Sequence, residues 1–317
     1  MICILNITIK HIKIEMFLLI ALIVILFLFL SSVTLVLLFI GPTILLQPRR
    51  RHPLFYQKLN HPITPKDLEL KFEEISVVTR DGVKLHSWLV KRENECKGTA
   101  IYLHGVGDSK IAGLPFTKFF HENGYNVFLY DLRRHGESGG NYCTYGFNEK
   151  YDLMDVINYL SSRKDLHLGK IGVFGTSMGA AVAIQTAAID KRISAVAAEN
   201  SFATLRSIFD DYQKRIVKIP FHYLRNIVII RSERIAKFKA REVSPLKSVT
   251  EINIPVLFAY GKQDKHINYK NSITLHENAG TQKEICVIEH AEHNDMWDVG
   301  GKNYRNKLLE FFGKYLR

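Results

Sequence analysis

The chain has 317 residues, 47% of them hydrophobic and 23% charged, and its formal net charge is +12. This composition excludes an intrinsically disordered chain and a fibrous one. The basic balance alone would suit a nucleic-acid reader, but no recognition motif accompanies it, so we expect no nucleic-acid partner. A disulfide scaffold and a zinc site are disfavoured as well, because no CxxC spacing occurs among the four cysteines, Cys3, Cys96, Cys143 and Cys286.

The first predicted element is an N-terminal membrane anchor over residues 1–48, with its transmembrane part at about residues 16–40. Those 25 positions contain no charged residue, and a helix of that length can cross ~30 Å of hydrocarbon with some tilt. A cleaved signal peptide is the alternative. Its apolar region would be shorter and would end in small residues, whereas Gly41 and Pro42 follow here, and then three arginines at 49–51.

A juxtamembrane linker is expected next, over residues 49–72. More cations follow the apolar run than precede it, which favours a cytoplasmic location for the C-terminal part of the chain. The flanking cations are Lys10 and Lys13 on one side and Arg49, Arg50, Arg51 and Lys58 on the other.

Residues 73–317 are predicted to form an α/β domain. A hairpin is expected about Asp81 and Gly82, and six apolar runs then read as strands buried on both faces: 99–105, 126–133, 170–177, 193–201, 254–261 and 283–290. Helical periodicity occupies residues 151–162, 180–189, 268–278 and 303–315. This order predicts a mostly parallel sheet with helices on both faces.

A candidate nucleophile follows the third of these buried strands. Gly175-Thr176-Ser177-Met178-Gly179 is a G-x-S-x-G sequence, and it leads into an alanine-rich helix. A strained turn from strand to helix requires glycine two residues before and after the serine, because side chains there would collide with the neighbouring backbone. A glycine-lined helix start without a catalytic role is the alternative. We predict that Ser177 is the nucleophile.

A serine hydroxyl is a poor nucleophile unless a base removes its proton and an acid orients that base. Asp264 follows the strand at 254–261, and His293 follows the strand at 283–290. Both therefore lie at carboxyl ends of strands, where an open α/β sheet builds its site. We predict a triad of Ser177, Asp264 and His293, with His290 as the rival base and Glu199 as the rival acid.

A tetrahedral intermediate also needs backbone N–H donors. Met178 offers one, because it follows the serine at the start of a helix. The turn after the strand at 99–105 offers the other, from Val106. His104, in the same turn, is interpreted as a residue that shapes the loop and not as a base.

These residues carry a family resemblance. His104-Gly105, the segment 131–138, the elbow at Ser177, the turn that ends at Asp264 and the ending His293-Asn294-Asp295 together resemble the α/β-hydrolase superfamily over about residues 75–316. The anchor, the short insertion and the continuation Met296-Trp297 are similar to membrane-anchored hydrolases of the bud-emergence homologue type and to related acyl-protein and lysophospholipid hydrolases.

The resemblance implies the α/β-hydrolase fold, with a short helical cap, and a reaction that needs neither a metal nor an organic cofactor. The chain departs from the family at two positions. Arg134 stands where a glycine is usual in the segment 131–138, and Ala180 stands where many relatives have a further glycine. The first departure bears on the shape of that loop, and neither touches the triad.

The function predicted is that of a membrane-anchored serine hydrolase, which cleaves carboxylic esters or thioesters through an acyl-enzyme. Lipid or acyl-chain substrates are favoured, because an anchor holds the site near acyl chains. A serine peptidase or a small-ester esterase on the same fold is an alternative. A catalytically inactive, membrane-tethered interaction module is another, although such a module would be expected to lose a triad residue and none is missing.

The segment that breaks the alternation of strands and helices, about residues 202–242, is called the cap. Between Arg206 and Arg241 it has ten Lys or Arg residues against Asp210, Asp211 and Glu233, a net +7. Apolar residues lie between these charges: Ile216, Val217, Ile219, Phe221, Tyr223, Leu224 and 227–230. We predict that the cap lies on an anionic membrane surface with its apolar side at the acyl entrance. An ordinary lid with its charges in water is the alternative.

Overall fold

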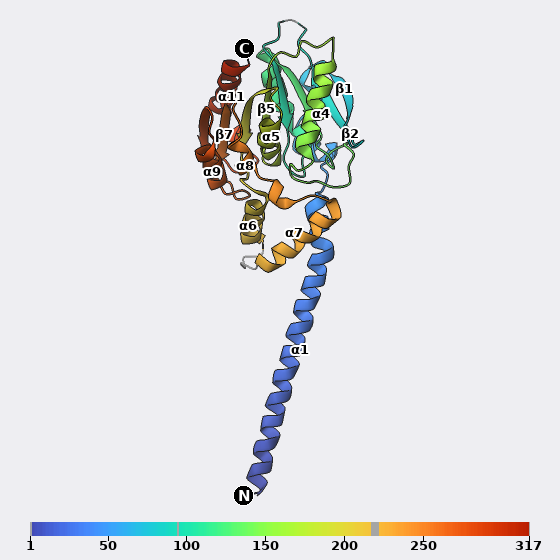
Figure 1. Ribbon diagram of the computed structural model, residues 1–317, viewed down its shortest axis with the longest axis vertical. Coiled ribbons are helices and arrows are strands. Elements are labelled where there is room, and N and C mark those ends of the chain that lie inside the picture. The colour runs from blue at the N-terminus through green and yellow to red at the C-terminus, as the bar shows by residue number, and fades with distance from the viewer. Residues whose placement is uncertain (1, 94, 217–221, 317) are drawn as a thin grey trace.

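A computed structural model describes residues 2–93, 95–216 and 222–316 of the protein. It has two visibly different parts (Figure 1): a long N-terminal helix, α1 (Ile2–Leu46), and a globular part that contains the sheet. The helix leaves the globular part on the side opposite the C-terminal end of the chain (Figure 1). The predicted division into an apolar N-terminal helix and an α/β domain is therefore visible in the architecture.

Eight strands in the described chain form one sheet in the order β1-β2-β4-β3-β5-β6-β7-β8. Their bounds are β1 Glu73–Val78, β2 Lys84–Val90, β3 Thr99–Leu103, β4 Asn126–Tyr130, β5 Ile171–Thr176, β6 Ile193–Glu199, β7 Val256–Gly261 and β8 Lys283–Ile288. β2 runs antiparallel to β1 and β4, and the strands from β4 to β8 are parallel. The predicted hairpin and the mostly parallel sheet are thus confirmed.

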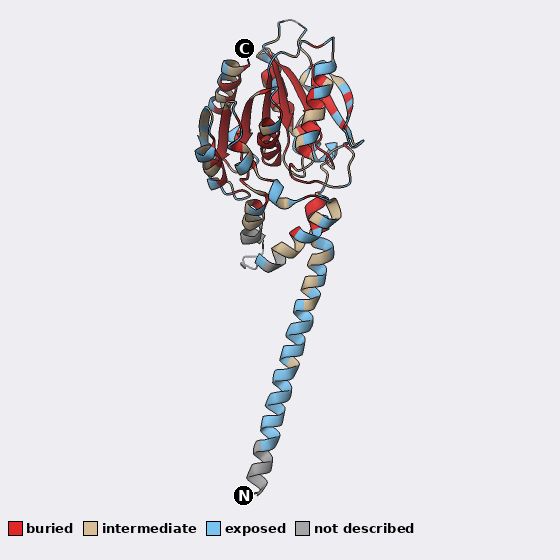
Figure 2. Ribbon diagram, in the orientation of Figure 1, coloured by how far each residue is buried: buried red, intermediate tan, exposed pale blue. Residues whose placement is uncertain are grey.

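Helices cover both faces of this sheet because its side chains alternate between two apolar cores. Ile101 and Leu103 of β3 contribute to one core, while Ala100 and Tyr102 contribute to the other. On the first side lie α4 (Glu149–Ser162), α5 (Met178–Ile189), α8 (Pro245–Val249) and α9 (Lys270–Asn278); on the second lie α3 (Leu114–Glu122), α10 (Met296–Val299) and α11 (Gly301–Tyr315). The central strands of the sheet are buried (Figure 2), whereas the edge strands β1 and β8 are partly exposed.

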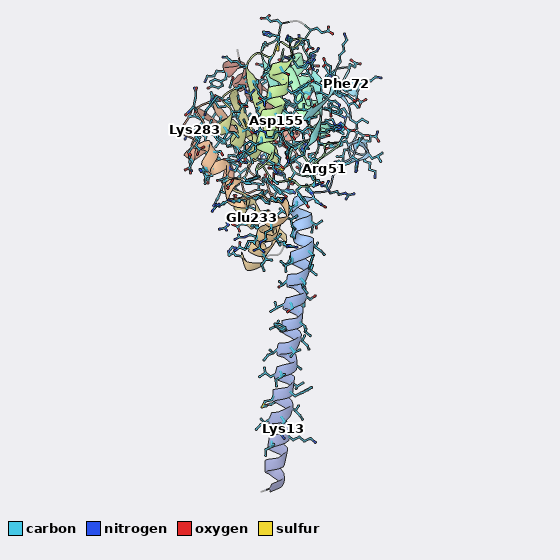
Figure 3. All side chains as sticks on the ribbon, turned by 45° about the vertical axis from the view of Figure 1, so that its right-hand side comes forward. Lys13, Arg51, Phe72, Asp155, Glu233 and Lys283 are labelled. Carbon is cyan, nitrogen blue, oxygen red and sulfur yellow. The ribbon has the colours of Figure 1, made fainter. Side chains whose placement is uncertain are left out.

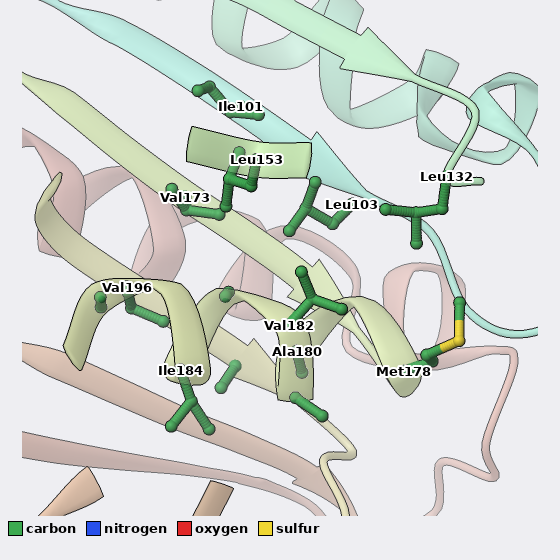
Figure 4. Close-up of a cluster of buried hydrophobic side chains, with 14 of the residues drawn as sticks. Ile101, Leu103, Leu132, Leu153, Val173, Met178, Ala180, Val182, Ile184 and Val196 are labelled. Atoms are coloured by element: carbon green, nitrogen blue, oxygen red, sulfur yellow. The ribbon is translucent and has the colours of Figure 1, made fainter. Parts of the chain in front are cut away.

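The first of the two cores extends to the carboxyl ends of the central strands. Figure 4 shows Leu103 at the end of β3, Leu132 after β4 and Met178 at the start of α5 among the buried side chains of this core. All three are fully buried or nearly so. Buried apolar side chains therefore pack beneath the loops that follow β3 and β4 and beneath the turn that precedes α5.

The cap lies between β6 and β7. It contains α6 (Leu205–Ile216), α7 (His222–Ala236) and a short 3-10 turn at Ala240–Glu242, while residues 217–221, including Val217, Ile219 and Phe221 of the predicted apolar side, lie outside the described residues. Figure 1 places α6 and α7 at the end of the globular part from which α1 emerges. Because the cap follows the carboxyl end of β6, this is also the edge of the sheet that carries Ser177.

Helix α1 extends beyond the predicted span of residues 16–40 in both directions. Its stretch Ile9–Leu46 is long and apolar enough to cross a membrane, with a mean hydropathy of 3.1 in an 18-residue window of which no residue is buried. The last turns are different. Leu45 and Leu46 are buried in the globular part, and a Cβ added at Gly41 would lie 2.7 Å from Val228 of α7. The end of the helix is therefore built into the domain.

The segment predicted as a juxtamembrane linker also packs on the domain. It contains α2 (Pro53–Gln57) and a 3-10 turn at Pro65–Leu68. The Arg50 guanidinium donates hydrogen bonds of 2.9 Å to the carbonyl oxygens of Gly136 and Ser138, which follow β4. At least the first part of residues 49–72 is thus a docked element, held by loops distant in the sequence.

Candidate active site

Ser177 sits between β5 and α5 with φ 54° and ψ −114°. L-residues rarely adopt this backbone conformation, and it is typical of a serine held in a sharp turn from strand to helix. The flanking glycines are required by close packing. A Cβ at Gly175 would overlap the backbone of Gly179, and a Cβ at Gly179 would overlap the Leu103 carbonyl.

Three side chains from three separate strand ends meet in one hydrogen-bonded series. His293 Nε2 lies 3.0 Å from Ser177 Oγ, and His293 Nδ1 lies 2.6 Å from Asp264 Oδ2. With its proton on Nδ1, His293 donates to Asp264 and accepts the hydroxyl proton of Ser177. The structure thus brings together Ser177, Asp264 and His293, the three residues predicted as a triad.

Asp264 is fixed by its own surroundings. Its other oxygen, Oδ1, accepts the backbone N–H groups of His266 and Ile267 at 2.7 and 2.9 Å, and its side chain is 1% exposed. Both carboxylate oxygens are therefore engaged, which leaves Asp264 one orientation relative to His293. An acid held in this way keeps the imidazole in the tautomer that accepts a proton from serine.

The rival acid and base lie elsewhere. Glu199 is buried and accepts a hydrogen bond of 2.5 Å from the Tyr304 hydroxyl, and burial raises the pKa of its carboxyl to about 7. Only its backbone takes part in the site, because its carbonyl accepts the Ser177 N–H at 2.8 Å. His290 is exposed in the turn after β8. Among the described contacts, neither side chain is bonded to Ser177 or His293.

Asn200 connects the ends of β6 and β7 to His293 and was not anticipated from the sequence. It has φ 49°, its Oδ1 accepts the Gly261 N–H at 3.0 Å, and its Nδ2 donates to the His293 carbonyl at 3.1 Å. His266 was missed as well; its ring stacks on the His293 ring with centroids 5.1 Å apart. Asparagine directly after a strand was the available signal, since it tolerates a left-handed backbone.

The two predicted oxyanion donors flank Ser177. Met178 is the first residue of α5, so its N–H has no acceptor inside the helix. Val106 is the second residue of a turn that closes from the Asp108 N–H to the Gly105 carbonyl at 3.2 Å. A Cβ at Gly105 would lie 3.3 Å from Ser177 Cβ, which places this turn beside Ser177.

The His104 side chain contacts the backbone of this turn and of the loop after β4. Its Nε2 accepts the Leu132 N–H at 2.9 Å, and its Nδ1 lies 2.7 Å from the Gly105 carbonyl oxygen. Burial lowers the pKa of the ring, which favours its neutral form. These contacts join the loops after β3 and β4, in keeping with the predicted role of His104 in shaping the loop.

The departure at Arg134 leaves the loop after β4 in a glycine-like shape. Arg134 has φ 67°, and its N–H donates to the Gly139 carbonyl at 2.7 Å. A left-handed conformation costs an L-residue ~1–2 kcal/mol, and the loop carries that strain. Arg134 therefore adopts the left-handed backbone conformation that a glycine would favour at this position.

Comparisons with known proteins agree with this architecture. A family model described as serine aminopeptidase, S33, matches residues 94–238. The α/β hydrolase domain-containing protein WAV2 of Arabidopsis thaliana is 30% identical over 266 residues, which cover 81% of this chain and 83% of that protein. Protein bem46 of Schizosaccharomyces pombe is 29% identical, with 79% and 80% covered.

A solved structure and a further relative bear on the fold and on the N-terminal helix. The Pyrococcus furiosus esterase Pf2001 superposes with a TM-score of 0.68 at 28% identity, covering 80% of this chain and 96% of that one. A Saccharomyces cerevisiae relative, 25% identical with 76% of this chain and 82% of its own covered, is named an uncharacterized membrane protein, YNL320W.

Proposed function

Because the chain belongs to the α/β-hydrolase superfamily, in the group of the bud-emergence homologues, we propose that it is a serine hydrolase of carboxylic esters or thioesters. The observation that carries the proposal is the series from Ser177 through His293 to Asp264, at 3.0 and 2.6 Å. An inactive module on this fold would have no need of a strained serine with a base and an acid aligned behind it.

The reaction follows from the positions of these groups. His293 Nε2 accepts the Ser177 proton while Oγ attacks the acyl carbonyl carbon, and the carbonyl oxygen becomes an oxyanion that faces the N–H groups of Val106 and Met178. When the intermediate collapses, His293 gives the proton to the departing alkoxide or thiolate. Water then enters by the same base-assisted attack, and the acid product leaves Ser177 free.

Acyl chains of lipids are the substrates that the architecture supports best. The cap and the end of α1 lie on the side from which α1 leaves the domain (Figure 1). The cap follows the carboxyl end of β6, and Ser177 follows the carboxyl end of its parallel neighbour β5. A membrane crossed by α1 would therefore face the triad. The excess of cations after the helix, including Arg49 to Arg51, favours a cytoplasmic position for the domain.

The test uses the full chain in lipid nanodiscs, a fluorophosphonate probe, and acyl esters and thioesters of graded chain length. The intact protein should be labelled and should prefer long acyl chains, while Ser177→Ala should lose labelling and should hydrolyse ~10³-fold or more slowly with its fold unchanged. Undiminished hydrolysis by a folded Ser177→Ala protein would contradict the mechanism.

A peptidase is the second candidate, and the description of the matching family model as a serine aminopeptidase is what favours it. An amide needs the same triad with a protonated amine as the leaving group. Aminoacyl arylamides added to the same panel separate the two functions. Cleavage of arylamides with no cleavage of acyl esters would replace the lipid-hydrolase proposal by this one.

A further inference from the structure

The segment that joins α1 to α2 lies against the loop that carries Val106. Arg51 Nη1 donates a hydrogen bond of 3.0 Å to Asp108 Oδ2. The Tyr56 hydroxyl donates to the other oxygen of Asp108 and lies 2.9 Å from Ser109 Oγ. Tyr56 is 3% exposed, so its ring is part of the core. Figure 3 shows Arg51 where α1 joins the globular part.

The loop between β3 and the 3-10 turn at Lys110–Gly113 is fixed at both ends. Gly105 packs on Ser177, as described above. At the other end, the buried Lys110 donates its backbone N–H to Asp131 Oδ1 and its ammonium to Asp131 Oδ2, both at 2.7 Å. Between these ends, Gly107 has φ +73°, and a Cβ there would lie 3.5 Å from the Arg49 carbonyl oxygen.

The middle of the loop is thus held by residues 49–56, which precede the predicted α/β domain. Asp108 closes the turn that presents Val106, and its carboxylate is gripped on both oxygens by side chains of residues 49–56. The remaining described hydrogen bond to that carboxylate is local, from the Ser109 N–H at 3.0 Å. Where Asp108 lies therefore depends on Arg51 and Tyr56.

We propose that Arg51, Tyr56 and Asp108 are positioning residues that aim the Val106 N–H at the developing oxyanion. The junction of the anchor thereby serves the reaction as well as the attachment of the domain. This inference rests on the proposed hydrolase function. An oxyanion donor must be oriented before charge develops, and the oxyanion exists only near the transition state. Loss of the contacts of Arg51 and Tyr56 with Asp108 should therefore lower kcat and leave KM nearly unchanged.

The experiment compares full-length variants in nanodiscs on one acyl ester. Tyr56→Phe keeps the buried ring and removes only the hydroxyl, Arg51→Ala removes the ion pair, and Asp108→Asn keeps the shape of the acceptor. Each should lower kcat ~10-fold or more with KM changed less than about twofold. Arg51→Lys should recover part of the loss. Affinity for a trifluoromethyl ketone, which forms an oxyanion on Ser177, should fall in parallel with kcat/KM.

Lys58→Ala is the matched control, since it removes an exposed cation just after α2. Its kcat should equal that of the unaltered protein. The inference is overturned if the variants keep both kcat and ketone affinity, if only KM rises, or if they lose thermal stability with kcat/KM of the folded fraction unchanged. Failure of the hydrolase proposal looks different, because the unaltered protein would then match Ser177→Ala on every ester.

Discussion

At the scale of single residues, the backbone of Ser177 carries a strain that the neighbouring structure maintains. Its φ of 54° is held by β5 before it, by α5 after it and by the hydrogen bond of its N–H to the Glu199 carbonyl. Residues in such conformations cost on the order of 1–3 kcal/mol and persist only where the surroundings over-determine them. This backbone conformation places Ser177 Oγ 3.0 Å from His293 Nε2.

The acid and the base should differ in importance when they are substituted. His293→Ala removes the proton acceptor, so kcat should fall as far as in Ser177→Ala, ~10³-fold or more. Asp264→Asn should cost less, because the imidazole remains present though misoriented. Steady-state kinetics on an acyl ester measures both. His290→Ala is the control; a large loss there, with His293 dispensable, would mean that the base is misassigned.

Glu199 should make stability depend on pH. Its pKa is raised to about 7 mainly by burial, so between about pH 4.5 and pH 7 the folded chain holds a proton that the unfolded chain has released. The stability from this group is complete below that window and is lost as pH rises through it. Glu199→Gln should reduce the fall in unfolding free energy across the window by on the order of 3 kcal/mol.

Thermal unfolding at the two ends of that pH window measures the effect. Glu289→Gln, at an exposed position after β8, is the control and should leave the pH dependence as it is. An unchanged slope in Glu199→Gln would show that this carboxyl titrates alike in the folded and unfolded chains.

The sequence predicted that Ser177, Asp264 and His293 would come together, but it did not predict the residues around them, for a physical reason. A local motif, G-x-S-x-G, indicates Ser177. Asp264 and His293 are indicated because each follows a predicted strand later in the chain. Asn200 and Tyr56 act through partners far along the chain, Gly261 and Asp108. No local pattern encodes such pairs, because they depend on how loops meet at the edge of the sheet.

At the scale of elements, the buried strands were predictable because continuous apolar runs leave few alternatives. Helix α3 was not among the predicted helices, although its buried rings, Phe116 and Phe120, have helical spacing, because a segment of nine residues is short for a prediction from periodicity. Helix α1 lies within the predicted anchor of residues 1–48 but is longer than its uncharged run, because Lys10, Lys13 and Glu15 end that run without ending the helix.

The cap divides its cations between internal and exposed positions. Arg225 pairs with Asp210 inside the cap. The described cations at exposed positions are Arg206, Arg231, Arg234, Lys237, Lys239 and Arg241. On α7, Ile229 is buried while Ile230 is 48% exposed. The arrangement supports the proposed contact of α7 with an anionic membrane, because α7 lies beside α1 and exposes the cations Arg231 and Arg234 next to the apolar Ile230.

Charge reversal on α7 tests that contact. In nanodiscs with anionic lipid, residues 225–236 should exchange amide hydrogens more slowly than in neutral nanodiscs, and added salt should remove the difference. Arg231→Glu with Arg234→Glu should abolish it, because each cation contributes about 1 kcal/mol at such a surface. Reversal of Lys164 and Lys191, exposed before β5 and β6, is the matched control. Equal exchange in both lipids would leave the cap an ordinary lid.

At the scale of the whole molecule, the end of α1 is part of the hydrolase core. Leu45 and Leu46 are buried, the Leu45 carbonyl accepts the Tyr145 hydroxyl at 3.0 Å, and the Leu46 carbonyl accepts the Cys143 N–H at 2.8 Å. The boundary between anchor and domain that the sequence indicated, at residue 48, therefore does not coincide with a boundary of packing.

Truncation should reveal this overlap. A chain that begins at residue 49 loses two buried leucines and strands a buried N–H, at a cost of ~5 kcal/mol, or a Tm lower by roughly 10 °C or more. A chain that begins at Ser31 keeps these contacts and should melt close to the full protein in the same detergent. Equal melting of the two truncated chains would show that the contacts contribute nothing.

If α1 crosses a membrane as proposed, the hydrogen bond from the Cys143 N–H to the Leu46 carbonyl also affects which substrates Ser177 can reach. A domain on a flexible linker of some twenty residues would wander ~25 Å and could sample acyl esters dissolved nearby or carried by another vesicle. In the proposed arrangement the end of α1 is packed into the domain, so Ser177 would keep a nearly constant height and tilt over the bilayer that α1 crosses. Turnover should consequently follow the mole fraction of substrate in that bilayer, and diluting the substrate with inert lipid should slow the reaction even when its total concentration is unchanged.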